Sequence, residues 1–313
     1  MDKLPLVVIV GPTASGKTAL SIETAKRHNG EIVSADSMQI YKGMNIASAK
    51  PTEDEKQGIP HHLMGFLDIT EKFSVADYLE KARNAINDIH DRGKLPIVVG
   101  GTGLYVSSII DNVKFDSIKS DGTVRERLTR ETDELGAEAM LDRLMEVDKE
   151  TAQTLHPNNR TRIIRALEVF ELTGTKLSIQ KDLSRAEESP YYECIIGLNF
   201  NDRSDLYDRI NQRVDIMINQ GLIDEAKEIY DNYSLKTACQ AIGYKELIPY
   251  FNGEEKLEVC IDKIKQETRR YAKRQLTWFR RDERINWIMM DKDTNFENII
   301  NKCEKIIANS DIL

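Results

Sequence analysis

Eight residues near the start of the chain, GPTASGKT at positions 11 to 18, have the residue types and spacing of a phosphate-binding loop. They fit the pattern G-x-x-x-x-G-K-[ST], and they stand between an apolar run and a segment with helical spacing. The glycines let backbone N–H groups close around phosphate oxygens, and the N-terminus of the following helix adds partial positive charge. In this pattern Lys17 reaches the outer phosphate and the hydroxyl of Thr18 can ligate Mg²⁺. The stretch therefore predicts a site for a phosphorylated ligand.

The acidic residues that accompany this loop indicate how the phosphate is used. A nucleoside triphosphatase usually adds an apolar strand that ends in Asp and organises Mg²⁺. Here the candidate strand at 95–101 runs into GGTGLY, so Asp36, at the end of the second strand, is the only acid so placed. Parallel strands bring their carboxyl ends to one edge of a sheet, so we expect Lys17, Asp36 and Thr102 in one crevice. This set favours a site for a diphosphate with a base beside it over a hydrolytic motor.

Alternating strands and helices must position these side chains. Short apolar runs rich in Val and Ile predict buried parallel strands. These runs lie at 4–10, 31–36, 95–101, 192–200 and 284–291. Ser74 is expected to cap an amphipathic helix at 74–92, and residues 123 to about 185 show helical patterns with no strand. The expected fold is α/β: a P-loop parallel sheet core flanked by helices, with an all-helical insertion domain.

The change of pattern along the chain predicts three segments. Residues 1–116 form the first part of the core, 117–188 the helical insertion, and 189–313 the second part of the core with a basic C-terminal helix. The net charge is −8, yet residues 263–284 hold nine basic and three acidic residues. A groove for a polyanion needs such segregated charge, although a solvated helix face would produce it too.

The remaining composition favours a soluble cytoplasmic protein. No apolar window is long enough to span a membrane, and no signal peptide is recognised. The pair His61 and His62 is expected in a loop, where adjacent side chains point apart and do not favour a shared metal. The four cysteines form no C-x-x-C pair and no zinc pattern with His, so reduced thiols are expected. They are Cys194, Cys239, Cys260 and Cys303.

Five motifs, in order, resemble those of the bacterial tRNA dimethylallyltransferases. They are GPTASGKT, SADSMQIYKGM, GGTGLY, HPNNRTRIIRALEVFELTG and TRRYAKRQLTWFRR, and the resemblance covers residues 5 to 290. The family transfers the dimethylallyl group of dimethylallyl diphosphate to N6 of adenine 37, just 3′ of the tRNA anticodon. The resemblance implies a helical insertion that helps clamp the anticodon stem-loop. It also implies a channel that the lipid diphosphate enters at one end and the nucleotide at the other.

One loop departs from the family's pattern. The family commonly has YKGMDIGTAKP where this chain has YKGMNIASAKP, so Asn45, Ala47 and Ser48 replace Asp, Gly and Thr. Ser48 keeps a hydroxyl. Ala47 takes a positive φ less readily than Gly, which leaves the local loop shape open at this point.

The resemblance assigns the leaving diphosphate to the phosphate loop, with Mg²⁺ held by Thr18. The loop residues concerned are Gly11, Thr13, Ala14, Ser15, Gly16, Lys17 and Thr18. Arg209 and Arg213 stand at i and i+4 on one helix face, where they either reach the diphosphate or form surface salt bridges. Ile210, Val214 and Met217 lie on another face of that helix and are expected in the core.

The predicted catalytic set is Lys17, Asp36 and Thr102. Asp36 is the expected base, because a carboxylate within reach of N6 needs no large pKa shift when the amine acidifies as it is alkylated. A magnesium ligand or a cap of the next turn is its alternative role. Thr102 is expected to hydrogen-bond either the bridging oxygen of the diphosphate or the amine.

Three segments match the family's tRNA contact regions, and Thr102 and Arg125 are further candidates. The segments are Asp36, Ser37, Met38 and Gln39; Thr161, Arg162, Ile163, Ile164 and Arg165; and Cys239, Gln240, Ala241, Ile242, Gly243, Tyr244, Lys245 and Glu246. In the second segment the two arginines share a helical face, while the two isoleucines pack inward. An extruded base is expected to stack on an aromatic such as Tyr244, and Gln39 or Gln240 could read a base edge.

Two other activities stay open on the sequence. An adenylate isopentenyltransferase would use the same chemistry on AMP, but such relatives have a shorter insertion, and residues 123–185 favour tRNA. A P-loop small-molecule kinase would need ATP and an acidic metal site beyond Asp36. The expected partners are therefore tRNA and dimethylallyl diphosphate, with Mg²⁺ as cofactor and a monomeric, cytoplasmic protein.

Overall fold

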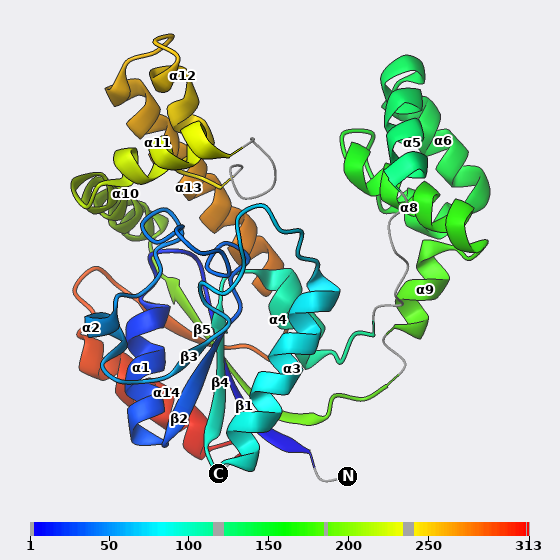
Figure 1. The fold of residues 1–313 in the computed structure, drawn as a ribbon. Helices are drawn as coiled ribbons and strands as arrows, with labels where there is room; N and C mark the ends of the chain where they lie inside the picture. The colour runs from blue at the N-terminus through cyan, green and yellow to red at the C-terminus, as the bar shows by residue number, and fades with distance from the viewer. Residues whose placement is uncertain (1–2, 115–121, 185–186, 234–240, 311, 313) are drawn as a thin grey trace. The chain divides into compact units, whose positions relative to one another are not determined.

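The structure is a computed structural model that describes residues 3–114, 122–184, 187–233, 241–310 and 312 (Figure 1). The chain divides into two compact units. Met1–Ile110 and Ser189–Leu313 form one, which we call the core unit, and Asp111–Glu188 form the other, the helical unit.

A parallel sheet forms the centre of the core unit, and among the described residues it has six strands in the order β3-β2-β4-β1-β5-β6. The strands are β1 (Leu4–Val10), β2 (Gly30–Ser34), β3 (His61–His62), β4 (Leu95–Gly100), β5 (Tyr191–Phe200) and β6 (Asn286–Met290). Every pairing is parallel, which confirms the expected α/β class. The loop expected at His61 and His62 is wrong, because these two residues pair with Ile32 and Val33 at the sheet edge.

Helices connect the strands and cover the sheet, and the expected cap of α3 is present. Ser74 accepts a hydrogen bond from the N–H of Asp77, whose side chain bonds back to Ser74, so both orphan donors are satisfied. The helices of the core unit are α1 (Lys17–Arg27), α2 (Glu53–Lys56), α3 (Val75–Asp91), α4 (Gly103–Ile110), α10 (Arg203–Asn219), α11 (Leu222–Asn232), the 3₁₀ helix η2 (Lys245–Leu247), α12 (Ile248–Phe251), α13 (Leu257–Phe279) and α14 (Phe296–Ala308).

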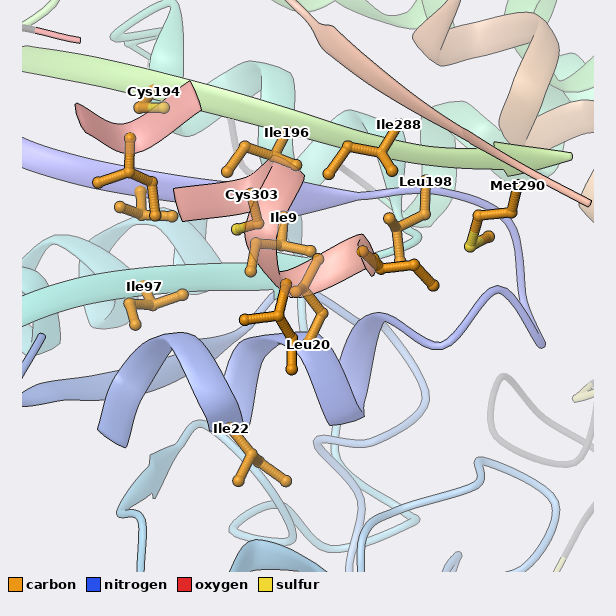
Figure 2. Close-up of a cluster of buried hydrophobic side chains, with 14 of the residues drawn as sticks. Ile9, Leu20, Ile22, Ile97, Cys194, Ile196, Leu198, Ile288, Met290 and Cys303 are labelled. Atoms are coloured by element: carbon orange, nitrogen blue, oxygen red, sulfur yellow. The ribbon is translucent and has the colours of Figure 1, made fainter. Parts of the chain in front are cut away.

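The central strand β1 is buried on both faces, and its alternating side chains set the register of the sheet. Val7 and Ile9 pack with Leu20 of α1 and Cys303 of α14 in one cluster (Figure 2). The other side chains of β1 pack with α3 and α4 in a second cluster. A slip by one residue would exchange the two faces, so burial fixes where β1 ends and the phosphate loop begins.

A third apolar cluster ties the segment after Asp36 to the second half of the chain. Residues of 38–47 pack there against α10, α11, α13 and the segment that leads into η2. The fully buried members include Ile40, Tyr41, Met44, Leu222, Ala226, Tyr244, Leu247 and Ile264. The loop beyond β2 is therefore held by residues that follow it by about two hundred positions in the sequence.

The helical unit contains no strand among its described residues. Its helices are α5 (Gly122–Leu135), α6 (Ala137–Val147), α7 (Lys149–Gln153), α8 (Arg160–Thr173) and α9 (Leu177–Leu183). They enclose their own core, in which Leu128, Met140, Leu144 and Ile163 are fully buried or nearly so. Within the described part of the chain, no helix has the length and apolar character needed to cross a membrane.

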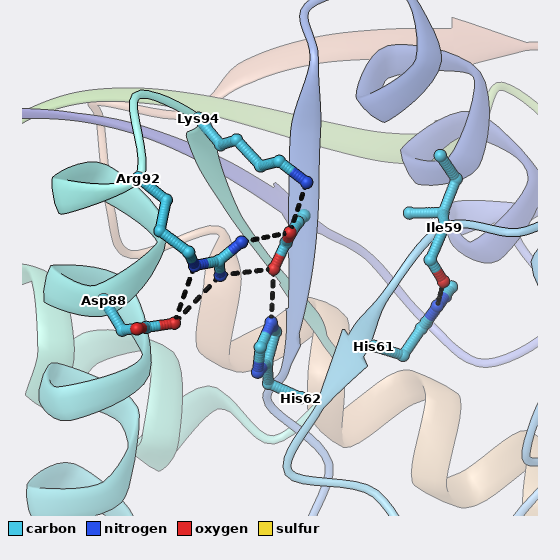
Figure 3. Close-up of polar contacts among 7 residues, drawn as sticks. Ile59, His61, His62, Asp88, Arg92 and Lys94 are labelled. Carbon is cyan, nitrogen blue, oxygen red and sulfur yellow. Dashed lines mark hydrogen bonds and ion pairs between the residues drawn. The ribbon is translucent and has the colours of Figure 1, made fainter.

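A charged cluster lies at the amino-terminal ends of the strands, the edge of the sheet away from the phosphate loop (Figure 3). The carboxylate of Glu31 accepts hydrogen bonds from Arg92 at 2.6 and 2.7 Å and from Lys94 at 2.6 Å, and it lies 2.7 Å from Nε2 of His62. These bonds, those from Arg92 above all, hold the pKa of Glu31 well below its usual range despite burial. The cluster joins the starts of β2 and β4 to β3.

Candidate active site

The phosphate loop lies between β1 and α1, the strand–loop–helix context that its pattern requires. Gly11 has φ 149°, and a Cβ at this position would lie 2.7 Å from the carbonyl oxygen of Leu198. Gly16, directly before α1, has φ 92°. Both positions are left-handed, so the two glycines of the pattern are needed for the shape of the loop. Ala14 takes φ 63° as well, which a non-glycine residue adopts only where its surroundings impose it.

Three cations converge on this loop. Nζ of Lys17 donates to the carbonyl oxygen of Pro12 at 2.6 Å, and Nε of Arg209 donates to that of Ala14 at 3.0 Å. Burial, together with the charge of Arg213 and against the charge of Asp36, lowers the pKa of Lys17 to about 7. The gathered positive charge is unfavourable until an anion binds, which is the property of an anion site.

The two arginines of α10 face this site. Burial lowers the pKa of Arg213, the charge of Arg209 adds to that effect, and the charges of Glu55 and Asp36 oppose it. Neither arginine forms an ion pair with any described residue. Their position favours the diphosphate role over the surface salt bridge. In the same helix Ile210 and Val214 are buried, as the pattern predicts.

A buried hydroxyl in the loop also lacks a partner. Oγ of Ser15 is inaccessible to solvent and makes no hydrogen bond with the described residues. A buried polar group without a partner costs about 1–3 kcal/mol, so a ligand oxygen at this position would stabilise the loop.

Asp36 lies two residues beyond the end of β2 and closes a turn. Its Oδ1 accepts hydrogen bonds from the N–H groups of Met38 at 2.8 Å and Gln39 at 3.3 Å. Burial raises the pKa of Asp36, whereas these two hydrogen bonds and the nearby positive charges of Lys17 and Arg213 lower it. No described residue donates to Oδ2. The turn therefore orients the carboxylate and leaves one oxygen able to accept a proton.

Thr102 joins the loop after β4 to the loop after β2. Its N–H donates to the carbonyl of Ala35 at 3.2 Å, and its Oγ1 accepts from the N–H of Ser37 at 3.0 Å. A Cβ at Gly100 would lie 2.1 Å from the carbonyl oxygen of Ala35, so glycine permits this close approach. Thr102 and Asp36 are therefore on neighbouring backbone segments, and Asp36 interacts electrostatically with Lys17. The three predicted catalytic residues lie in one site.

Two residues of α13 that the sequence reasoning missed complete this site. The buried amide of Gln275 accepts from the N–H of Thr13 at 2.9 Å and donates to the carbonyl of Gly101 at 3.0 Å. The hydroxyl of Tyr271 lies near the side chains of Thr102 and Gln275, and burial raises its pKa well above the usual value. Their spacing could have revealed them, because Tyr271 and Gln275 are four residues apart and so share one face of the helix. The motif that contains them was interpreted only from its basic residues, as a surface for RNA.

Within the first predicted tRNA segment, Gln39 has an internal role. Its Nε2 donates to the carbonyls of Ser48 and Ala49, both at 3.3 Å, and its Oε1 accepts from the hydroxyl of Ser34 at 2.9 Å. The amide that was expected to read a base edge is thus engaged within the loop. Ser37 and Met38 are partly exposed beside it.

The third predicted segment is more buried than expected. Tyr244 is only 3% exposed, and its hydroxyl donates to Oε1 of Glu225 at 2.7 Å, so the expected stacking of a base on this ring is wrong. Packing in the third cluster is the reason, since the ring lies among apolar side chains. Ala241, Gly243 and Glu246 are also buried, whereas Ile242 is partly exposed and Lys245 exposed. Cys239 and Gln240 lie outside the described residues.

The predicted residues of the helical unit divide into a buried and an exposed group. Ile163 and Ile164 pack in its core, so their side chains cannot contact RNA, and their place among the contacts is corrected to a packing role. Arg125 and Arg165 both donate to the fully buried carboxylate of Glu168, at 2.7 and 2.9 Å. Thr161 and Arg162 are exposed at the start of α8.

The basic helix α13 is partly neutralised. Four basic residues of 263–284 form ion pairs. Lys263 and Arg270 pair with Glu267, Lys265 pairs with Asp215, and Arg284, beyond the end of the helix, pairs with Asp282 and Glu193. Five basic residues of 263–284 form no ion pair with the described residues: Arg269, which donates to Oδ1 of Asn211 at 2.6 Å, and Lys273, Arg274, Arg280 and Arg281. The positive charge available to a partner therefore lies mainly in the last two turns of α13 and in the two arginines that follow it.

Comparison with known proteins places these features in one family. A model of the family described as IPP transferase matches residues 39–282. The chain is 47% identical over 301 residues to the tRNA dimethylallyltransferase of Caldanaerobacter subterraneus subsp. tengcongensis, covering 95% of both chains. It is 47% identical over 296 residues to the tRNA dimethylallyltransferase of Bacillus subtilis, covering 94% of both.

Two solved structures are also similar. The tRNA isopentenylpyrophosphate transferase from Bacillus halodurans has a TM-score of 0.74 and 46% identity, and the match covers 98% of this chain and 96% of that one. A eukaryotic dimethylallyltransferase acting on tRNA has a TM-score of 0.82 and 31% identity, with 98% of this chain and 80% of that one covered.

Proposed function

The chain belongs to the IPP transferase family, whose relatives named above are tRNA dimethylallyltransferases, and we propose that it transfers the dimethylallyl group of dimethylallyl diphosphate to N6 of adenine 37 in tRNA. It is a tRNA prenyltransferase. One arrangement supports the detailed reaction most directly. A phosphate loop with three converging cations stands beside the carboxylate of Asp36, which keeps one oxygen free to accept a proton.

The phosphate loop stabilises the leaving diphosphate. The departing group gains negative charge in the transition state, and prepositioned donors act most strongly on charge that develops there. Lys17, Arg209 and Arg213 supply the positive charge, and the unpartnered hydroxyl of Ser15 offers a further donor. The N–H groups of Thr13 and Ser15 are already used by Gln275 and by the carbonyl of Pro12, so the other N–H groups of the loop bind the diphosphate. Removal of one such donor typically costs about 3 kcal/mol in transition-state stabilisation.

Mg²⁺ is the proposed cofactor, and the residues present fit it. Thr18 is exposed at the start of α1, and its hydroxyl is not engaged by any described residue. The described residues contain no group of three or more His, Cys, Asp or Glu side chains that could hold a metal. Mg²⁺ keeps several waters and binds through few protein oxygens plus substrate phosphates, so a single hydroxyl beside a diphosphate suits it. When bound, the ion would neutralise charge on the leaving group.

Asp36 removes the proton from the attacking amine. The exocyclic N6 is a weak nucleophile whose proton becomes acidic as the new bond to carbon forms, so a carboxylate in contact is a sufficient base. The bonds from Met38 and Gln39 hold Oδ1 and leave Oδ2 without a donor among the described residues, so Oδ2 can accept the proton. The hydroxyl of Thr102 accepts from the N–H of Ser37 and lies near Tyr271, so it can orient the amine or the bridging oxygen beside Asp36.

The acceptor is proposed to be a loop adenine of tRNA. The reacting base must leave its stack, which costs only a few kcal/mol in a single-stranded loop. The helical unit presents Arg162 with its guanidinium unpaired among the described residues. The end of α13 and the residues that follow it present Lys273, Arg274, Arg280 and Arg281, which form no ion pair with the described residues, and all of these cations suit a phosphate backbone. A free adenylate acceptor would give this second unit no role.

The proposed function is tested with labelled dimethylallyl diphosphate and three acceptors: total tRNA lacking the modification, AMP, and no acceptor. Label is expected in tRNA, at the adenine 3′ of the anticodon, and in neither control. Transfer to AMP alone, or consumption of ATP without the isoprenoid donor, would contradict the proposal. Asp36→Asn should lower single-turnover rate by roughly 10²- to 10⁴-fold with tRNA affinity within a few-fold, and Asp54→Asn, at an exposed acid of α2, is its matched control.

A further inference from the structure

We propose that Glu225 is a positioning residue that holds the loop after Asp36 in the shape required by the tRNA, an inference that rests on the proposed function. Glu225 belongs to α11, and no part of the sequence pattern marks it as a site residue. It lies far from Asp36 in the chain, but its carboxylate joins the 45–47 turn, which follows the predicted tRNA segment at 36–39, to Tyr244 of the predicted segment at 239–246.

The carboxylate of Glu225 binds three successive backbone N–H groups. Oε2 accepts from Asn45 at 2.8 Å and from Ile46 at 2.9 Å, and Oε1 accepts from Ile46 at 3.1 Å and Ala47 at 3.0 Å. Successive N–H groups that converge in this way form a concavity for an anion. In this protein a side chain about 180 positions further along the chain supplies the anion.

The same carboxylate also holds the segment around Tyr244. The hydroxyl of Tyr244 donates to Oε1 at 2.7 Å, and its ring is buried in the third cluster. A Cβ at Gly243 would lie 3.5 Å from Cβ of Ala47, so the two backbone segments are in van der Waals contact. Glu225 therefore fixes the spacing between the 45–47 turn and the segment that leads into η2.

Hydrogen bonds connect this turn to the catalytic acid. The carbonyls of Ser48 and Ala49 accept from the side-chain amide of Gln39, and the N–H of Gln39 donates to Oδ1 of Asp36. Glu225 is thus linked to Asp36 through one turn and one side chain. A shift of the 45–49 loop would move the backbone that orients the base.

The loop does not hold this shape by its own preference. Ala49 takes φ 51°, a left-handed conformation that a residue with a Cβ rarely adopts unless its surroundings impose it. Ala47 stands where relatives commonly have Gly, but it does not have a positive φ, so alanine fits this position without backbone strain. Its N–H is used by Glu225 instead. The N–H of Ala49 donates to the carbonyl of Ile46 at 2.9 Å, and the N–H of Ile46 is itself bound by Glu225, so Glu225 holds the turn against which Ala49 is fixed.

The position of Glu225 predicts which substrate is affected. Its hydrogen bonds to described residues go to the 45–47 turn and to Tyr244, and none goes to the phosphate loop at 11–18. Loss of the carboxylate should disturb the acceptor side of the site and spare the donor side. A role in general stability would weaken both sides equally.

The experiment compares Glu225→Gln and Glu225→Asp with the matched control Glu228→Gln, at an exposed acid one turn along the same helix. For Glu225→Gln we expect the KM for tRNA to rise roughly 10- to 100-fold, the loss expected when a set of hydrogen bonds to a charged group is removed. The KM for dimethylallyl diphosphate and the Kd for inorganic pyrophosphate should stay within about two-fold of wild type. Glu225→Asp restores the charge and should recover part of the loss.

Hydrogen exchange of the amides of residues 45–47 provides a second, structural measurement. These amides should be protected in wild type and exchange faster in Glu225→Gln, while amides of α1 keep their protection. Tyr244→Phe, which removes one of the bonds and keeps the buried ring, should raise the KM for tRNA by a smaller factor. Unchanged tRNA kinetics in Glu225→Gln, or equal loss of tRNA and pyrophosphate binding, overturns the inference. If wild type itself fails to prenylate tRNA, the proposed function fails instead, so the two failures are distinguishable.

Discussion

Replacing Gln275 by leucine tests whether α13 positions the two loops that grip the substrates. The amide of Gln275 is buried and bridges the phosphate loop at Thr13 and the loop after β4 at Gly101. Leucine has a similar volume but offers no hydrogen bond. The variant therefore leaves one N–H and one C=O without their partner and removes little packing.

The expected loss follows from the environment of each group. The bond to Gly101 is buried, and a buried group left without a partner costs about 1–3 kcal/mol. The bond from Thr13 is partly exposed, so water can replace it and its loss should cost about 1 kcal/mol. We therefore expect about 2–4 kcal/mol in total. If the loops must hold this geometry in the transition state, kcat/KM falls by about 30- to 800-fold.

The assay is steady-state prenylation of tRNA together with calorimetric titration of pyrophosphate. We expect kcat/KM for dimethylallyl diphosphate to fall within that range and pyrophosphate to bind more weakly. Gln266→Leu, on the same helix but with its side-chain bond to Lys263 exposed, should behave as wild type. A Gln275→Leu variant that is folded, with Tm lowered but kcat/KM and pyrophosphate affinity unchanged, would show that the bridge contributes only to stability.

Three further predictions follow from charge. The pKa of Lys17 is about 7 in the folded protein and 10.5 ordinarily, so the free-energy penalty for burying the charged amine is full below pH 7 and fades as the pH rises toward 10.5. Lys17→Met should therefore raise Tm more at pH 6 than at pH 9. The same variant should abolish the proton uptake that accompanies pyrophosphate binding to wild type at pH 8. The pKa of Glu31 is depressed, so the stability that its carboxylate contributes is present above about pH 4.5 and is lost as the pH falls. Glu31→Gln should lower the free energy of unfolding, measured by urea titration, by about 2–3 kcal/mol at pH 7 and by less at pH 3. An equal loss at the two pH values would contradict this prediction. The affinity for tRNA should fall steeply as the salt concentration rises. Arg280→Gln should make the slope of the logarithm of the association constant against the logarithm of the salt concentration shallower by about one. An unchanged slope would place Arg280 outside the RNA interface.

The parts of the proposed site whose place in the fold the sequence predicts depend on local signals. The phosphate loop is a contiguous pattern between a buried strand and a helix, and Asp36 follows the end of a strand whose position its apolar run defines. The rule that parallel strands gather their carboxyl ends at one edge then brings Thr102 to the same place.

The parts that the sequence does not predict depend on long-range packing. Gln275 hydrogen-bonds a residue 262 positions away, and no local pattern indicates such a partner. Tyr244 lies in a segment too short for helical periodicity to reveal burial, so the third cluster that encloses it could not be foreseen. The strand at His61 and His62 has only two residues, and its pairing with β2 determines it rather than its own sequence.

A crystal structure of the enzyme with pyrophosphate, Mg²⁺ and an anticodon stem-loop tests the central claim most directly. The account predicts pyrophosphate within the loop at 11–18, in contact with Lys17 and the hydroxyl of Ser15, and Oδ2 of Asp36 within hydrogen-bond distance of N6 of the adenine. Pyrophosphate bound elsewhere, or a carboxylate of Asp36 turned away from the adenine, would contradict it.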